Sequence, residues 1–358
     1  MRDTKRAVVP AFQASLYSDA GFGVLGRVLE KLTNKTYAEA LQTSLAGPLG
    51  LKSSSSIKPS DKGLNALATN DSSWGFDNQL TAPSGGVYSN AHDLRELGLS
   101  ILQARLLSAD TVRHWMKPLA HTAALTSSVG APWEIHRLTL PVSPASKRTR
   151  LSDLYTKLGG QLGYATVFAL SPDHGLGFSI NIAGDAAIAA RIPLRDLVGS
   201  VFVTAAEYAG VENAAINYSG KFADPNNKDS SVSLKIDSDR PGIGLESLFI
   251  NGTDWLGNIT LSQGELDSSK FSYRLFPAEL EYPNPSSSGV IKKFNAASSS
   301  IAGEPRAAIE GGPGLFDDCS SWMSTGFFTT GEFELEVVKG RVESVKYLDA
   351  NVTMQRVK

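Results

Sequence analysis

Residues 151–184, LSDLYTKLGGQLGYATVFALSPDHGLGFSINIAG, contain three short runs of β-forming residues. The runs cover residues 151–158, 164–170 and 177–182, and turn residues such as Ser171-Pro172-Asp173 separate them. A fourth run of the same kind, Trp133–Leu140, stands just before them. Short β-like runs joined by turn signals predict an antiparallel meander.

Helical patterns lie on both sides of this meander. Ser18–Thr33 repeats apolar residues at helical spacing and offers Ser18 or Asp19 as an N-cap. Similar patterns predict further helices over residues 37–45, 90–102, 108–116 and 186–208. Helices, then a sheet, then a closing helix predict an α+β domain.

The pattern changes after Gly210. Alternating runs rich in β-formers cover residues 231–236, 243–250, 270–276 and 333–338, and Lys339-Gly340 has the composition of a hairpin turn. We therefore expect two domains, an α+β domain over residues 1–210 and an all-β domain over 211–358, built as a small barrel or sandwich.

The composition of the chain argues against several classes of function. The 358 residues hold 34 Lys and Arg against 36 Asp and Glu, a net charge of −2, so no basic excess indicates nucleic acid. No run of about 18 apolar residues exists, so no membrane span is expected. One cysteine and five histidines, none of them at H-x-x-x-H spacing, predict no metal site. We also expect no cofactor, because the G-x-G-x-x-G at Gly21–Gly26 lies inside the first predicted helix with no strand before it.

Two tyrosine triplets are candidates for chemistry, Tyr17-Ser18-Asp19 and Tyr88-Ser89-Asn90. A tyrosine beside a lysine can act as a general base on a serine hydroxyl, because a neighbouring cation lowers the pKa of the phenol. The alternative for each triplet is a helix cap with a tyrosine packed on the first turn.

The first triplet continues through an apolar helix to Thr33 and is followed by Gly47-Pro-Leu-Gly-Leu51. In this order the chain resembles the serine β-lactamase-related family, the penicillin-recognising hydrolases that include class C β-lactamases and DD-peptidases. The family's Tyr-x-Asn motif then corresponds to Tyr17-Ser18-Asp19. Pro83–Leu94 resembles a non-catalytic segment of the same family, so the resemblance makes Tyr88 structural.

The family's third motif, K-[ST]-G, resembles Lys157-Leu158-Gly159, followed by Gly160. The resemblance runs from about Tyr17 through nearly the whole chain. It implies a β-lactamase/transpeptidase-like fold and a small-molecule ester, amide or peptide-like substrate. It also implies that Tyr17 is the base, that Lys157 supplies positive charge, and that Gly160 N–H is an oxyanion donor. Asp19 and Gly159 support that site.

Fungal secreted members of the family are the most similar, and they carry an appended β-domain that opens like Tyr218–Phe222. Six N-x-S/T sequons, at Asn34, Asn70, Asn217, Asn251, Asn258 and Asn351, favour a secreted glycoprotein, although the first residues show no signal peptide. Localisation stays open at this point. The single Cys319 is either a buried free thiol or half of a disulfide.

Two departures from the family pattern matter. The family's nucleophile is the serine of an S-x-x-K that precedes the tyrosine motif, whereas the one S-x-x-K here, Ser55–Lys58, follows it. We therefore expect either an N-terminally truncated serine hydrolase that is inactive as this chain, or a non-catalytic secreted binding protein (a pseudoenzyme) that uses the residual cleft. Leu158 stands where the family has Ser or Thr, which favours esterase or amidase chemistry over β-lactam recognition. Asp19 stands where the family has Asn, and this change is tolerable because Asp19 could pair with a lysine.

Overall fold

The computed structural model describes residues 9–10, 13–67, 72–75, 80–237, 240–262, 271–300 and 331–357. Contacts divide the chain into two compact units, described separately below. The first comprises Met1–Pro141 and Thr149–Glu207, and the second comprises Val142–Arg148 and Tyr208–Lys358. Cys319 and the sequon at Asn70 lie outside the described residues.

Side-chain caps fix the helix starts in the first unit. Ser18 Oγ accepts a hydrogen bond from Gly21 N at the start of α1, and Asn90 and Ser108 cap α5 and α6 in the same way. The second predicted helix is longer than expected: a π-helical turn over Gln42–Ala46 continues it to α3, which ends at Gly50 with φ of +68°. The helices before the sheet are α1 (Asp19–Thr33), α2 (Tyr37–Leu41), α3 (Gly47–Leu49), α4 (Ala82–Gly85), α5 (Ala91–Leu102) and α6 (Ala109–Trp115).

The predicted meander is confirmed. Six described strands form one antiparallel sheet in sequence order. They are β1 (Ala120–His121), β2 (Ser127–Val129), β3 (Glu134–Pro141), β4 (Thr149–Gln161), β5 (Tyr164–Ser171) and β6 (Leu176–Ala183). A single 3₁₀ turn, Pro172–His174, joins β5 to β6 at the predicted turn signal.

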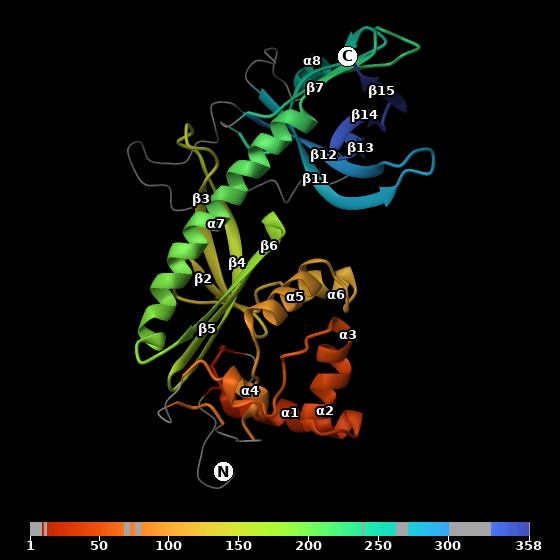
Figure 1. Ribbon diagram of the computed structural model, residues 1–358. Helices are drawn as coiled ribbons and strands as arrows, with labels where there is room; N and C mark the ends of the chain where they lie inside the picture. The colour runs from red at the N-terminus through yellow and green to blue at the C-terminus, as the bar shows by residue number, and fades with distance from the viewer. Residues whose placement is uncertain are drawn as a thin grey trace. The chain divides into compact units, whose positions relative to one another are not determined.

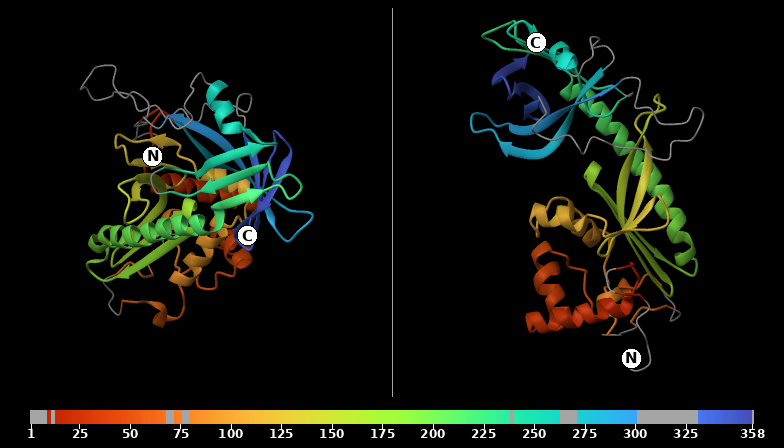
Figure 2. Two further views of the ribbon diagram at one scale, coloured as in Figure 1. Left: turned by 90° about the horizontal axis from the view of Figure 1, so that it is seen from above. Right: turned by 180° about the vertical axis from the view of Figure 1, so that it is seen from behind.

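Side chains alternate between the two faces of this sheet. Leu154 and Val167 pack with Val203 of α7 on one face. Tyr155 and Leu170 point the other way and pack with residues of α5 and α6. Figures 1 and 2 show α7 on one side of the sheet and α5 and α6 on the other.

The closing helix α7 (Ala187–Tyr218) extends ten residues beyond the predicted end at 208. Gly210, read from sequence as the start of the change to β-structure, lies inside it. An isolated glycine costs a helix only about 1 kcal/mol, so neighbouring helix-forming residues override it. The residues just after Gly210 are therefore helical, and the domain boundary at that residue stays a prediction.

The second unit confirms a C-terminal β-barrel. Eight of its described strands pair in a ring, in the order β9-β11-β12-β13-β14-β15-β7-β8, and the pairing of β8 with β9 closes it. The elements are β7 (Gly220–Ala223), β8 (Ser231–Lys235), β9 (Ile243–Ile250), β10 (Thr253–Asp254), α8 (Trp255–Ser262), β11 (Phe271–Pro283), β12 (Val290–Ser300), β13 (Glu332–Val338), β14 (Arg341–Tyr347) and β15 (Val352–Arg356).

Large apolar side chains fill this barrel, among them Phe222, Leu275 and Tyr347. The predicted hairpin is present, since Lys339 and Gly340 have φ of +49° and +84° between β13 and β14. One short helix, α8, accompanies the strands of this unit. None of the helices in the described residues is long and apolar enough to cross a membrane.

Candidate active site

The structure brings Tyr17 and Lys157 together. Lys157 projects from β4, and Tyr17 is the residue just before the Ser18 cap of α1. Lys157 Nζ lies 5.3 Å from the centroid of the Tyr17 ring. The Tyr17 side chain remains 73% exposed, so its hydroxyl is open to a ligand from solvent. The Lys157 ammonium is within cation–π distance of the Tyr17 ring.

Glu134 holds Lys157 in place. Lys157 Nζ donates to Glu134 Oε1 at 2.9 Å and to the carbonyl of Leu158 at 2.7 Å. The second carboxylate oxygen of Glu134 accepts a hydrogen bond from Leu158 N at 3.2 Å. Sequence reasoning missed Glu134, because a single acidic residue at the start of a strand carries no motif signal.

The end of β4 forms an open strand edge. Strand β3 pairs with β4 only as far as Glu134 opposite Thr156, whereas β5 continues to pair as far as Gln161. Leu158 directs its N–H and C=O to the open side, where they meet the side chains of Glu134 and Lys157. Backbone direction alternates along a strand, so Gly160 directs its N–H to the same open edge.

Gly159 and Gly160 are required by packing around this edge. A Cβ on Gly159 would collide with Thr166 Oγ1 of the neighbouring strand. A Cβ on Gly160 would lie 2.7 Å from Ile188 and 2.9 Å from Arg191, both on α7. A side chain at either position would require Thr166, or Ile188 and Arg191, to move, so the two glycines allow the observed packing around β4.

Asp19 occupies the first turn of α1, where a carboxylate stabilises the helix N-terminus. Within the described part of the chain it has no ion-pair partner, so the pairing with a lysine considered from sequence does not occur. In the sequence, Asp19 follows the Ser18 cap, which itself follows Tyr17.

Ser55 and Tyr88 are engaged with each other. They form a two-way backbone bridge of 3.0 and 2.8 Å, and Ser55 Oγ accepts a hydrogen bond from Ile57 N. The Tyr88 ring packs edge-on against Trp74, and its hydroxyl accepts from Gly75 N at 3.1 Å. These contacts support a structural role for Tyr88.

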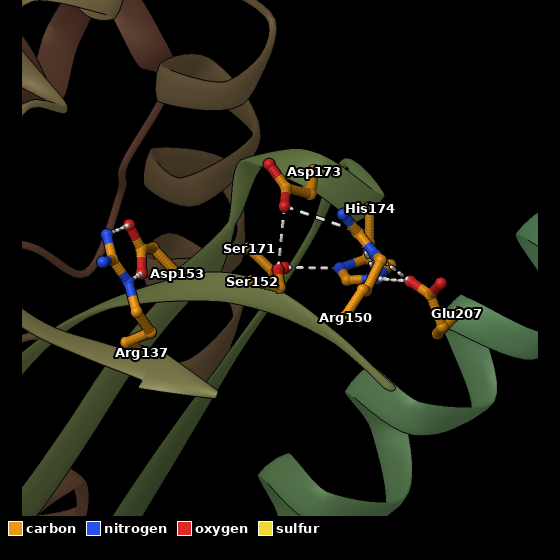
Figure 3. A network of polar contacts seen from close by, with 8 residues as sticks. All are labelled: Arg137, Arg150, Ser152, Asp153, Ser171, Asp173, His174 and Glu207. Carbon is orange, nitrogen blue, oxygen red and sulfur yellow. Dashed lines mark hydrogen bonds and ion pairs between the residues drawn. The ribbon is translucent and has the colours of Figure 1, made fainter. Parts of the chain in front are cut away.

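A second polar cluster resembles a catalytic relay (Figure 3). Ser171 Oγ lies 2.7 Å from His174 Nδ1, and His174 Nε2 lies 2.9 Å from Glu207 Oε2. Arg150 Nε donates to the same carboxylate oxygen at 2.7 Å. Because Ser171 is only 1% exposed, its hydroxyl cannot reach a substrate. The cluster therefore joins α7 to the sheet, and sequence reasoning had treated Ser171 only as part of a turn.

The glycine-rich motif near the N-terminus serves helix packing. All of Gly21–Gly26 lies within α1, as expected from its apolar spacing. A Cβ on Gly26 would collide with Pro83 of α4, and one on Gly23 would lie 2.9 Å from the Leu80 carbonyl. Across the described residues, no group of three or more His, Cys, Asp or Glu side chains is arranged to hold a metal ion.

Comparisons with known proteins agree with this architecture. A β-lactamase family model matches residues 6–200, and a model described as a β-lactamase-like C-terminal domain matches residues 210–358. A β-lactamase-like protein of Arthroderma benhamiae is 30% identical over 285 residues, which cover 75% of this chain and 47% of that protein. A probable hydrolase, clz13, of Cochliobolus lunatus is 28% identical over 71% of this chain and 40% of its own length.

Among solved structures, the octameric penicillin-binding protein homologue from Pyrococcus abyssi aligns with 97% of this chain and 66% of its own. The TM-score is 0.41 and the identity 13%. The chain spans about half the length of the curated relatives that it matches. Since the first family model covers more than half of the 358 residues, the chain belongs to the β-lactamase-like family.

Proposed function

We propose that this chain carries the base and oxyanion parts of an acyl-hydrolase site for a small-molecule ester, amide or peptide-like substrate. The observation that carries the proposal is the position of Lys157 Nζ above the Tyr17 ring, at the open edge of β4 beside Gly160. Because β3 ends at Glu134 opposite Thr156, the backbone of Gly160 is left for an extended substrate to pair with.

The chemistry follows from that arrangement. Tyr17 acts as the base in its phenolate form, and Lys157 stabilises that negative charge. A serine oxygen then attacks the substrate carbonyl while its proton passes to the Tyr17 oxygen, which becomes a neutral phenol. The Gly160 N–H binds the oxygen of the tetrahedral intermediate. Collapse of the intermediate expels the alcohol or amine with the proton from Tyr17, and water then hydrolyses the acyl-enzyme. The serine would come from an S-x-x-K segment, which does not precede Tyr17 in these 358 residues.

A non-catalytic binding protein is the second candidate. The observation that favours it is that Ser55, in the S-x-x-K of this chain, follows Tyr17 in the sequence and is bridged to Tyr88. A base and an oxyanion donor that engage no serine can bind an acyl compound but cannot form an acyl-enzyme. Leu158 in place of a hydroxyl-bearing residue reduces recognition of a substrate carboxylate in either case. Secretion, glycosylation and a fungal source belong to this proposal as expectations from the sequons and the resemblance.

The test supplies a nucleophile from solution. The 358-residue chain is incubated with p-nitrophenyl acetate, with and without hydroxylamine, and in parallel with a fluorophosphonate probe. We expect no stoichiometric probe labelling. We also expect saturable acceleration of hydroxylamine attack by about tenfold or more, within the ~10³-fold that binding and an oxyanion hole supply without a nucleophile. Lys157→Met should abolish the acceleration.

Three outcomes would overturn parts of this proposal. A wild-type rate equal to that in buffer would reject the hydrolase assignment and favour the binding protein. Labelling that disappears in Ser55→Ala would identify Ser55 as a nucleophile. Labelling that persists in Ser55→Ala would require a different serine in this chain.

A further inference from the structure

Arg191 of α7 contacts the peptide bond that carries the proposed oxyanion donor. Its Nη1 donates a hydrogen bond to the Gly159 carbonyl at 2.7 Å, and the same nitrogen would lie 2.9 Å from a Cβ on Gly160. Arg191 Nε is buried and has no hydrogen-bond partner among the described residues. The guanidinium is therefore packed against the backbone of β4 at the glycine pair.

The carbonyl that Arg191 binds and the proposed oxyanion donor belong to one peptide unit. The carbonyl of Gly159 and the N–H of Gly160 are bonded through the same planar, trans amide and so point in opposite directions. The carbonyl is held by Arg191, and the N–H faces the open edge of β4. A hydrogen bond at one end of an amide polarises it and strengthens the hydrogen bond at the other end.

The donor at this carbonyl is an unusually strong one. A guanidinium stays protonated at any working pH, and a charge-assisted hydrogen bond is roughly twice as strong as a neutral one. The neighbouring strand β5, which pairs Thr166 with Gly159, can offer that carbonyl only a neutral N–H, so Arg191 adds a charged donor to it. Arg191 also fixes the plane of the amide, which sets the direction of the Gly160 N–H.

We propose that Arg191 is a positioning residue that orients and polarises the Gly159–Gly160 peptide, so that Gly160 N–H is a strengthened donor to an oxyanion at the open edge of β4. The inference rests on the proposed function for its consequence in catalysis. The coupling between Arg191 and the Gly160 amide is a property of the folded chain and can be measured without any turnover.

Nuclear magnetic resonance can observe this one peptide selectively. When only glycine carries ¹³C at its carbonyl and ¹⁵N at its amide, an HNCO spectrum shows only glycines that follow a glycine. The sequence has three such pairs, 85–86, 159–160 and 311–312. Gly85→Ala identifies the first signal, because its Cβ would make only an ordinary 3.8 Å contact with Gln161. Gly311→Ala identifies the third.

We expect Arg191→Met to shift the Gly159 carbonyl and the Gly160 N–H signals upfield, while the Gly86 signal stays in place. Arg191→Lys should give a smaller shift, since a cation remains without the guanidinium fork. Arg195→Met is the matched control: it lies on the same helix, but it contacts His136 and Asp196 and should move none of the three signals.

The functional readout is the hydroxylamine-assisted cleavage of p-nitrophenyl acetate. Arg191→Met should lower its maximal rate by about tenfold at unchanged half-saturation, a fraction of the 10²–10³-fold that a whole oxyanion donor supplies. An unmoved Gly160 signal in Arg191→Met would overturn the inference, as would an equal shift in Arg195→Met. Absence of acceleration in the wild type would reject the proposed function, and the NMR result would then decide the inference by itself.

Discussion

Removal of the Glu207 carboxylate should destabilise the first unit, because the buried His174 and the partly exposed Arg150 both bind it. Glu207 lies on α7, is 6% exposed, and binds Arg150 Nε and His174 Nε2 (Figure 3). Glu207→Ala leaves His174 without its partner on α7 and leaves the Arg150 charge facing a cavity. The hydrogen bond from His174 to Ser171 alone cannot replace the contact between helix and sheet.

The magnitude follows from burial. Deleting one partner of a fully buried ion pair costs 3–5 kcal/mol in general. The Arg150 side chain is 34% exposed and also contacts Asp173 at 3.3 Å, so solvent and this carboxylate compensate for part of the loss. We expect Glu207→Ala to lower the free energy of unfolding by about 2–4 kcal/mol. Asp110→Ala breaks the exposed pair with Arg113 and should cost less than about 0.5 kcal/mol.

The assay is urea unfolding followed by tryptophan fluorescence, with Trp133 in the core of the first unit as an internal probe. The two compact units require a fit that allows two transitions. A loss below 1 kcal/mol in Glu207→Ala, comparable with that in Asp110→Ala, would refute the structural role of this cluster. Ser171→Ala distinguishes a structural role of the cluster from a catalytic one. A change in fluorophosphonate labelling in this variant would indicate a catalytic role.

Three further predictions concern pH and domain structure. Burial first, and then the charge of Arg195, lower the pKa of His136 below its ordinary 6.5, so the unfolded chain binds a proton that the folded chain resists. Stability should therefore fall as the pH drops below about 6.5, and His136→Gln should reduce that slope in urea titrations. The hydrogen bond to Glu334 raises the pKa of Tyr282 to about 12, so Glu334→Gln should move one tyrosine in an ultraviolet titration toward pH 10. Limited proteolysis should release a stable C-terminal barrel, and even cleavage across residues 190–240 would contradict a boundary near 210.

The sheet and the helix starts could be predicted because their signals are local. Serine and asparagine are preferred caps when they stand just before an apolar helical stripe. Short β-rich runs that are joined by turns usually pair with their neighbours in the sequence. The end of α7 could not be predicted in the same way. Gly210 is a weak local signal for a stop, because one glycine costs a helix only about 1 kcal/mol and helix-forming residues follow it.

Only part of the candidate site could be predicted from the sequence. The order of the motifs singles out Tyr17 and Lys157, but the distance between them depends on how α1 and β4 pack. Glu134 and Arg191 carry no spacing signal at all. Their roles arise because β3 ends opposite Thr156 and because one face of α7 packs against the glycine pair, and both facts are properties of the folded chain.

The Gly159–Gly160 peptide lies between cations on opposite faces of β4. Lys157 projects on the face that Tyr155 shares with α5 and α6, whereas Arg191 approaches from α7. The Glu134 carboxylate, which pairs with Lys157 at this edge, offsets the charge of that cation, whereas Arg191 acts directly on the Gly159 carbonyl. Leu158, in contrast, packs into the α7 face of the sheet and brings no hydroxyl to this edge. The lost hydroxyl is therefore a property of one face of β4, whereas the Gly160 N–H belongs to its open edge, so a change at Leu158 alone should leave the direction of that N–H unchanged.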